Sequence, residues 1–469
     1  MPRCTPSPRR RLPLILLSIA TALCARAEPQ VVISEIHFHP DTHRRNEEFI
    51  ELHNAGDAPA ALENWRVEGG LAFVLPNATL APGAYLAVAA DLPAFQTRYP
   101  GVTNVVGSYT GQLSNREDRI DLIDATGTRV DRVEYADEGD WAVRQRGALD
   151  NGHRGWAWYA AADGNGPSLE LVNPALPGNN GQNWLPSTAV RGTPGAPNSR
   201  ASANIAPLIL EARHVPAVPK AGDPIYLTAE IRDEAATGLT VALHYRIDGA
   251  PTFQTAAMLD DGLNGDGAPG DGLYGCRLPG QPQGTILEFY LRAEDASANV
   301  RTWPAAVQPE NQQLANALLQ VDSTAYNGVV PEYRLIMTEA ERAELDALGN
   351  NSTESNSHAQ MNGTLISRTP AGTELRYLCG FRNRGSGSRM ADPNNVRVNF
   401  RTDAKWEGVV AVNFNSRYVA GQVAGAALAP YGALAAAAAQ PVEVRVNNAD
   451  LAKNDAIMHG RYARVEVVD

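Results

Sequence analysis

Short runs in which apolar and polar residues alternate make up most of the chain after residue 30. In the first third, turn signals rich in Gly, Pro and Asn separate such runs: VVISEIHF, EEFIELHN, WRVEGGLAFVLP, AYLAVAAD, DRIDLID and TRVDRVEYA. A period of two is typical of strands that bury one face, and turns at this spacing favour an antiparallel sandwich. We therefore expect a β-sandwich over residues 28–200, with one short helix that has Asp91 as its N-cap.

The alternation continues into a second region and then changes. Residues 201–310 contain PIYLTAEIRD, LTVALHYRI and LEFYLRAED, and their length suits one immunoglobulin-like or fibronectin-like sandwich. Residues 311–325 are predicted as a linker. In residues 326–469, strand patterns alternate with two helical ones, one capped by Thr338 and one rich in alanine that starts near Arg417. The predicted fold class is mainly β and multidomain, with two sandwiches followed by an α+β region.

The composition narrows the possible partners. The chain has 469 residues, too many for one ordinary core. Its 52 Asp and Glu residues outnumber its 40 Lys and Arg residues, so the formal net charge is −12. Proteins that bind nucleic-acid backbones usually carry a basic balance or a basic stripe. We therefore expect no nucleic-acid partner, although a local basic patch remains compatible with this balance.

The N-terminus has the pattern of a secretory signal peptide over residues 1–27. Three arginines (9–11) precede an apolar stretch (12–23), and small residues precede a predicted cut after Ala27. An uncleaved anchor is the alternative. Residues 420–440 are alanine-rich and are predicted as a packed helix, because they lack the large apolar residues of a membrane span. The mature protein is therefore expected to be secreted, periplasmic or at the cell surface, with no transmembrane segment.

Histidines are concentrated near the start of the first predicted sandwich. Strand spacing places Glu35, His37 and His39 on one face, and His-x-His with a nearby carboxylate is compatible with zinc. However, Arg44 and Arg45 follow directly and would repel a cation. We therefore expect solvent-facing histidines, with a zinc site as the alternative.

The motifs of the first region resemble the bacterial lamin-tail domain, an immunoglobulin-like sandwich. The resemblance rests on EIHFHP, EEFIELHNAG, LAPGAYLAVAAD, GQLSNREDRIDLID, NGPSLELVNPAL and GTPGAPNS, which occur in the family's order. An insert at residues 145–163 carries Trp156, Trp158 and Tyr159. These aromatic side chains either form a binding platform or pack over the edge of a sandwich.

A basic loop rich in Gly and Ser follows a predicted strand near residue 380. Backbone N–H groups and guanidinium groups in such a loop suit a phosphate, whereas a tight polar hairpin is the alternative. The predicted phosphate-binding or nucleotide-binding residues are Arg384, Gly385, Ser386, Gly387, Ser388, Arg389 and Arg397.

Residues 326–469 resemble the N-terminal half of the CotH kinase-like family, through YRLIMTEAE, FRNRGSGSR, NNVRVNF, WEGVVAVNFNS, VEVRVNN and GRYARVEV. The resemblance implies an atypical protein-kinase fold and a nucleotide-phosphate role for the basic loop. Two departures bear on catalysis. Arg397 stands in the strand where the family often has a lysine, and the chain ends at Asp469, before the family's metal-binding and base residues. We therefore expect a truncated kinase-like lobe with no catalytic residues, and ATP with magnesium only if the full-length product is a kinase.

An acidic loop in the second region, MLDDGLNGDGAPGDGLYG, is a candidate calcium site. Ca²⁺ prefers oxygen ligands, and glycines let carbonyl groups turn inward. A solvated turn between strands is the alternative. The predicted ligands are Asp260, Asp261, Asn264, Asp266 and Asp271.

Three functions remain open. The first is a secreted or cell-surface binding and scaffolding protein, whose sandwiches contact a surface polymer or a protein. The second is a fragment of a secreted atypical kinase. The third is an adhesion stalk stabilised by calcium.

Overall fold

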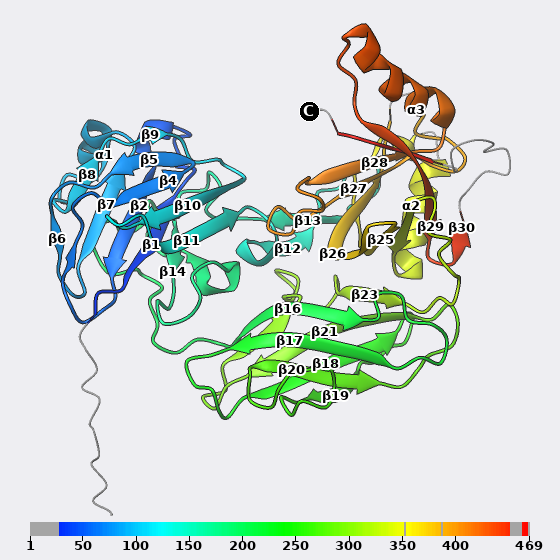
Figure 1. The fold of residues 1–469 in the computed structure, drawn as a ribbon, viewed down its shortest axis with the longest axis horizontal. Helices are drawn as coiled ribbons and strands as arrows, with labels where there is room; N and C mark the ends of the chain where they lie inside the picture. The colour runs from blue at the N-terminus through cyan, green and yellow to red at the C-terminus, as the bar shows by residue number, and fades with distance from the viewer. Residues whose placement is uncertain (1–27, 351–352, 386–387, 451–461, 468–469) are drawn as a thin grey trace, which may run out of the picture.

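The structure, a computed structural model, describes residues 28–350, 353–385, 388–450 and 462–467. Three β-rich bodies follow one another along the chain (Figure 1): a first sandwich, a second sandwich and a closed barrel. The prediction of a mainly β, multidomain fold is confirmed. The predicted signal peptide, residues 1–27, lies outside the described residues. Among the residues that are described, no helix has both the length and the apolar character needed to cross a membrane.

Two sheets packed face to face form the first sandwich. One has the strand order β15-β14-β1-β2-β7-β8, and the other has the order β11-β10-β4-β5-β9. Asp91 caps the short helix α1 as predicted, because its side chain accepts a hydrogen bond from the N–H of Ala94. The elements are β1 (Val31–His37), β2 (Phe49–Asn54), β3 (Ala60–Ala61), β4 (Arg66–Gly69), β5 (Leu71–Val74), β6 (Thr79–Leu80), β7 (Tyr85–Ala89), α1 (Leu92–Arg98), β8 (Val105–Gly107), β9 (Thr110–Gly111), β10 (Glu117–Ile123), β11 (Arg129–Ala136), β14 (Leu169–Leu171) and β15 (Trp184–Pro186).

The prediction of solvent-facing histidines on β1 is wrong for His37, which is fully buried. A β-bulge between Ile33 and Glu35 interrupts the alternation, so that Ile33 and Ile36 both enter the core between the sheets. Glu35 and His37 lie on the opposite face, which is also buried. Desolvation lowers the pKa of His37 to about 3, so its imidazole is neutral.

The second sandwich consists of one sheet with the order β16-β17-β20 and another with the order β19-β18-β21-β22. Its strands are β16 (Leu208–Val215), β17 (Ile225–Arg232), β18 (Thr240–Ile247), β19 (Gln254–Met258), β20 (Leu273–Leu278), β21 (Ile286–Glu294), β22 (Val300–Trp303) and β23 (Ala317–Gln320). The prediction of a linker at residues 311–325 is wrong, because β23 pairs with β21 and all four of its residues are buried. This strand is buried and completes a sheet, whereas a linker would remain solvated.

The third body is a barrel. Its sheet has the order β24-β25-β26-β27-β28-β31-β29-β30, and parallel pairing of β24 with β29 closes it into a ring that leaves β30 outside. Closure removes the unpaired edges that an open sheet would present. Trp406, Phe381 and Phe414 lie fully buried inside. The elements are β24 (Glu332–Ile336), α2 (Glu339–Asn350), β25 (Met361–Thr369), β26 (Gly372–Asn383), β27 (Val396–Asn399), β28 (Ala411–Asn415), α3 (Val419–Leu428), β29 (Ala439–Val446), β30 (Ala449–Asp450) and β31 (Tyr462–Val465).

The insert of the first sandwich is a hairpin that reaches the other two bodies (Figure 1). Its strands are β12 (Val143–Arg146) and β13 (Trp156–Tyr159). Trp156 is buried beside Val307 and Ala315 of the second sandwich, and its indole N–H donates to Glu341 of α2 at 2.7 Å. Trp156 is therefore no exposed binding platform. It joins the first sandwich to the other two bodies.

Candidate functional site

The arginine cluster, defined as Arg382, Arg384, Arg389 and Arg397, lies on the outer face of the barrel. Arg382 on β26 is paired directly opposite Arg397 on β27. Arg384 follows Arg382 by two residues, and alternation along a strand directs both side chains to one face. The neighbouring Phe381 and Val398 point into the barrel core. The sheet register thus sets Arg382 against the predicted residue Arg397, and the predicted residues Arg384 and Arg389 lie near them in the loop between the two strands.

The guanidinium groups of the cluster contact only neutral partners. Arg382 Nη1 lies 2.9 Å from Nδ1 of His358, and Arg389 donates to the carbonyl oxygen of Ser355 at 2.8 Å. Arg384 donates to the side-chain oxygen of Asn415, and Arg397 donates to that of Asn399. Within the described part of the chain, none of the four arginines has an ion pair with a carboxylate.

The positive charges of the cluster therefore act on one another. Desolvation, together with the charges of Arg397, Arg389 and Arg384, lowers the pKa of Arg382 to about 10. Desolvation and the charges of Arg382 and Arg389 also lower the pKa of His358, which favours its neutral form at pH 7. Arginine stays protonated even so, because its pKa remains well above 7. An anion placed among these groups would relieve their mutual repulsion.

A cavity of about 480 Å³ opens beside the cluster. The barrel lines it with Arg382, Arg397, His358, Gln360, Asn399, Phe400 and Val410, and the first sandwich adds Arg116 and Glu138. Burial raises the pKa of Glu138 to about 7, so this carboxyl group is partly protonated near neutral pH. The cavity is large enough for a phosphate group together with part of the molecule that carries it.

The loop between β26 and β27 is only partly described. Ser386 and Gly387 lie outside the described residues. Gly385 has a φ of +109°, and a Cβ added there would meet the hydroxyl oxygen of Ser388 at 2.5 Å, so this turn requires glycine. Asn395 donates to the same hydroxyl group at 2.8 Å. The sequence motif located this loop, but it did not indicate His358, which reaches the cluster only through folding.

The predicted calcium ligands form a loop whose carboxylates bind backbone N–H groups. Asp266 accepts from Asp261 and Gly262, both at 2.8 Å, and Asp260 accepts from Gly272 at 2.8 Å. Backbone N–H groups likewise lower the pKa of Asp271. No set of three or more His, Cys, Asp or Glu side chains in the described ranges has an arrangement that could hold a metal ion. Calcium binding at this loop stays a prediction.

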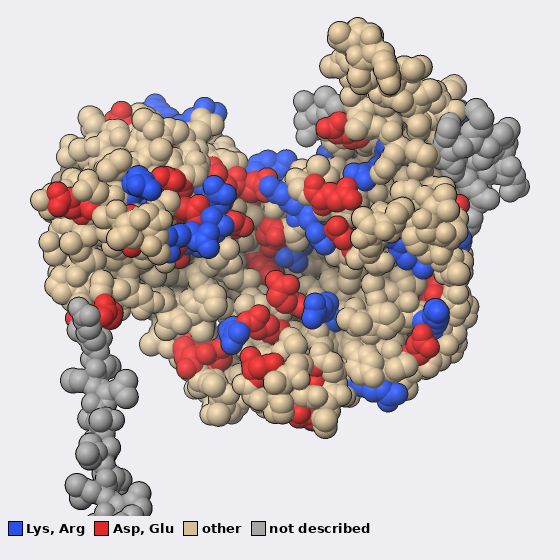
Figure 2. Space-filling view, in the orientation of Figure 1, with Lys and Arg blue, Asp and Glu red and all other residues tan. Residues whose placement is uncertain are grey.

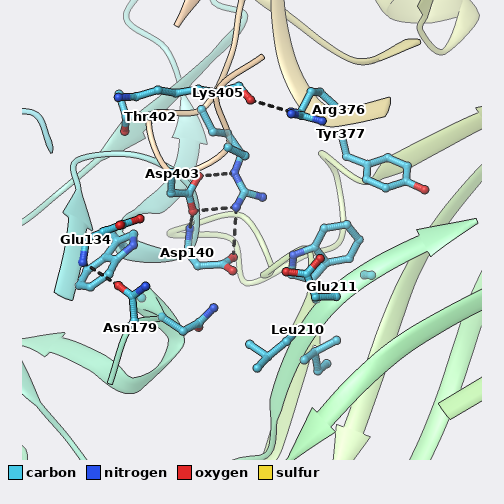
Figure 3. A pocket seen from close by; sticks show the side chains of 18 of the residues that line it. Glu134, Asp140, Asn179, Leu210, Glu211, Arg376, Tyr377, Thr402, Asp403 and Lys405 are labelled. Carbon is cyan, nitrogen blue, oxygen red and sulfur yellow. Dashed lines mark hydrogen bonds and ion pairs between the residues drawn. The ribbon is translucent and has the colours of Figure 1, made fainter. Parts of the chain in front are cut away.

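A larger cleft of about 1220 Å³ lies where the three bodies meet (Figure 3). Arg401 of the barrel donates two hydrogen bonds of 2.7 Å to Asp403 and lies 3.9 Å from Asp140 of the first sandwich. Lys405 of the barrel forms an ion pair of 2.7 Å with Glu117 of the first sandwich. These charges are paired with one another across the junction, so they stabilise the arrangement of the bodies.

The glutamate row, defined as Glu35, Glu51 and Glu170, crosses three adjacent strands of the first sandwich. Glu35 is paired directly opposite both Glu51 and Glu170, and all three side chains are fully buried. Segment 187–200 covers them: Thr193 N–H donates to Glu35 at 2.9 Å, and Ser199 donates to Glu170 at 2.7 Å. Desolvation raises the pKa of Glu35 to about 8, and desolvation with the charge of Glu35 raises that of Glu51 to about 9.

Comparison with known proteins identifies part of the first sandwich. Residues 25–137 match the family model of the Lamin Tail Domain, which confirms the predicted resemblance over that range. No curated protein matches the chain. The comparisons lend no support to the resemblance of residues 326–469 to the CotH kinase-like family, which stays a prediction.

Two solved structures show weak similarity to the chain. One is a cycloalternan-forming enzyme from Listeria monocytogenes in complex with a pentasaccharide substrate, with 9% identity, a TM-score of 0.17, and coverage of 43% of this chain and 19% of that one. The chain thus spans about a fifth of that enzyme's length. The other is a marsupial T cell receptor, with 8% identity, a TM-score of 0.18, and coverage of 80% and 96%. At these scores neither likeness carries an argument about fold or function.

Proposed function

We propose that this chain is a secreted modular binding protein whose arginine cluster binds a phosphate-bearing ligand. The observation that carries the proposal is the absence of any carboxylate paired with Arg382, Arg384, Arg389 or Arg397 in the described ranges, although these side chains are partly desolvated. Structural arginines usually have acidic partners, as Arg401 does. An unneutralised cluster at a cavity fits an anionic ligand instead.

Phosphate suits the donors that the cluster offers. A guanidinium group presents several N–H donors in a planar fork, which matches two phosphate oxygens at once. Four such groups from two strands and a loop can bind more than one phosphate oxygen or more than one phosphate. In this proposal the two sandwiches act as the scaffold: the first contributes Arg116 to the cavity, and its hairpin fixes it to the barrel.

Titration calorimetry tests the proposal. The full chain without its leader is titrated with pyrophosphate, and the double variant Arg382→Gln with Arg384→Gln serves as the test protein. Arg129→Gln is the matched control, because Arg129 is an exposed arginine on the far strand β11 of the first sandwich. We expect saturable binding to the wild type and to the control, and at least tenfold weaker binding to the double variant. Equal binding to all three proteins, or no binding to the wild type, contradicts the proposal.

The kinase alternative rests on the CotH-like resemblance and makes a different prediction. A nucleotide site would prefer MgATP to pyrophosphate, because the adenine and ribose add contacts. The same titrations with MgATP therefore separate the two functions. Equal affinity for pyrophosphate and MgATP favours a binding protein that recognises phosphate alone.

A further inference from the structure

Helix α3 and the turn that follows it form an apolar projection on the barrel. No residue from 418 to 441 is charged. The predicted helix is present over Val419–Leu428, but it has no buried residue, so the prediction that it is packed is wrong. The large side chains of the projection are exposed: Tyr418 by 82%, Leu428 by 65%, Tyr431 by 90% and Leu434 by 68%. The helix projects away from the barrel (Figure 1), and its visible surface carries no charged side chain (Figure 2).

An exposed apolar surface of this kind indicates a site that binds a partner or a membrane. Soluble proteins rarely expose contiguous apolar side chains on a projecting element, and those that do usually bind a partner or a membrane there. Tyr431 belongs to a short 3-10 helix, Ala429–Gly432, and Leu434 follows it. Leu428, Tyr431 and Leu434 therefore lie close together in sequence at the C-terminal end of α3, whereas Tyr418 precedes the helix.

The arginine cluster lies at the base of this projection. Arg384 donates to the side-chain oxygen of Asn415, whose amide group donates to Gln422 of α3 at 2.7 Å. Gln422 in turn donates to the carbonyl oxygen of Arg417, an exposed arginine just before the helix. Hydrogen bonds thus connect the cluster to the helix, and positive charge adjoins the uncharged projection.

We propose that the projection and the arginine cluster together dock the protein on an anionic phospholipid surface. The apolar tip would enter the interfacial region, where tyrosine and leucine side chains are favourable, and the arginines would contact lipid phosphates. This inference rests on the proposed phosphate binding. Charge complementarity favours a lipid surface as the partner. A bilayer places a layer of phosphates above an apolar layer, and the protein has positively charged arginines at the foot of an apolar projection.

Two features oppose a purely electrostatic attachment. The chain carries a formal net charge of −12, and Glu466 lies near the helix base, where it accepts the N–H of Ala438 at 3.0 Å. The apolar projection must therefore contribute to membrane binding, and binding should require both the projection and the arginine cluster. Added salt should weaken the arginine contacts and leave the apolar contribution in place.

Vesicle co-sedimentation of the full chain without its leader tests the proposal. Vesicles of phosphatidylcholine with phosphatidylglycerol are compared with vesicles of phosphatidylcholine alone. The tip variant replaces Leu428, Tyr431 and Leu434 with Gln, and because these side chains are exposed it should fold normally. We expect it to bind anionic vesicles at least tenfold more weakly and to keep wild-type affinity for pyrophosphate. Arg382→Gln with Arg384→Gln should lose both activities, and Arg129→Gln should lose neither.

The outcomes separate this proposal from the previous one. Wild-type protein that binds pyrophosphate but not anionic vesicles overturns the lipid proposal alone. Wild-type protein that binds neither overturns both. Unchanged vesicle binding by the tip variant overturns the docking role of the projection. A concentration-dependent dimer in sedimentation velocity that the tip variant abolishes, without vesicle binding, assigns the projection to a second copy of the chain and likewise overturns the lipid proposal.

Discussion

The glutamate row and the arginine cluster are two groups of like charges that the fold treats in opposite ways. Both lie on adjacent paired strands, with Glu35 opposite Glu51 and Arg382 opposite Arg397. The glutamates are fully buried under segment 187–200, whereas Arg382 and Arg397 of the arginine cluster border a cavity. Each group consists only of side chains of one type, so no member can neutralise another.

The difference follows from the chemistry of the two side chains. A carboxyl group can avoid repulsion by binding a proton, and burial raises the pKa of both Glu35 and Glu51 far enough for this. Arginine has no such escape, because it stays protonated at any ordinary pH. A cluster of arginines must therefore remain open to water or to an anion. In the three-body cleft the charges are neutralised in another way, because Arg401 lies between two aspartates of opposite charge.

The largest expected effect is on the pH dependence of stability, to which the buried Glu35 and Glu51 contribute. In the unfolded chain Glu35 and Glu51 ionise near pH 4.5, but in the folded chain they stay protonated up to about pH 8 and 9. The folded state thus binds more protons in this range, so stability is highest below it and falls as pH rises towards 9. Each group can cost up to about 1.4 kcal/mol per pH unit. We expect the melting temperature to fall from pH 6.5 to pH 9.

The double variant Glu35→Gln with Glu51→Gln isolates this effect, because glutamine does not titrate. Its melting temperature should depend less on pH over the same range than that of the wild type. Glu63→Gln, at an exposed glutamate, serves as the control and should follow the wild type. Parallel profiles for the double variant and the wild type would show that the glutamate row does not hold protons.

The next effect concerns the paired charges of the cleft. Asp403→Ala leaves Arg401 largely buried without its bidentate partner, and breaking such a pair costs about 3–5 kcal/mol. We expect a lower melting temperature for the transition that includes the barrel, measured by calorimetry, with pyrophosphate binding unchanged at temperatures below it. Glu211→Ala in the same cleft is the control, because Glu211 is exposed. Equal losses for both variants would contradict a structural role for the Arg401 pair.

A smaller change in stability, with no loss of melting temperature, is expected for a variant of the arginine cluster. Arg382→Gln removes one of several repelling charges, so the melting temperature should stay the same or rise slightly. The loss appears in binding instead: one charge-assisted contact is worth about 1.5–3 kcal/mol, or at least a tenfold loss of pyrophosphate affinity. Scanning calorimetry and titration of the same sample measure the two quantities. A variant that melts much earlier would mean that Arg382 supports the fold rather than a ligand.

The smallest effect concerns the acidic loop around Asp266. A calcium ion bound only to the folded state would stabilise it, so EDTA would lower the melting temperature by a few degrees and added calcium would restore it. Asp271→Asn should then reduce the response to EDTA. A melting temperature that EDTA leaves unchanged would contradict calcium binding, and the hydrogen bonds from backbone N–H groups would be enough to explain the acidic residues.

Local patterns predicted much of the first sandwich. Period-two runs predicted β1, β2, β7, β10 and β11, and the capping aspartate predicted the start of α1. The bulge in β1 was not predictable in this way, because one extra residue in a pairing leaves no periodic trace. The error at His37 has another cause, because its face of the sheet was predicted correctly but was assumed to meet water, and that face is buried. Strand β23 was missed because a short apolar run between polar segments does not show which sheet it completes.

The sequence by itself determined the mainly β character, the Lamin Tail Domain match and the position of the basic loop, because these depend on neighbouring residues. Tertiary structure alone decided which charges meet. The pairing of β26 with β27 sets Arg382 against Arg397, and the pairing of β1 with β2 sets Glu35 against Glu51. Register and burial depend on contacts between segments far apart in the chain. They also decide whether a group of like charges can take up protons or must remain open to a ligand.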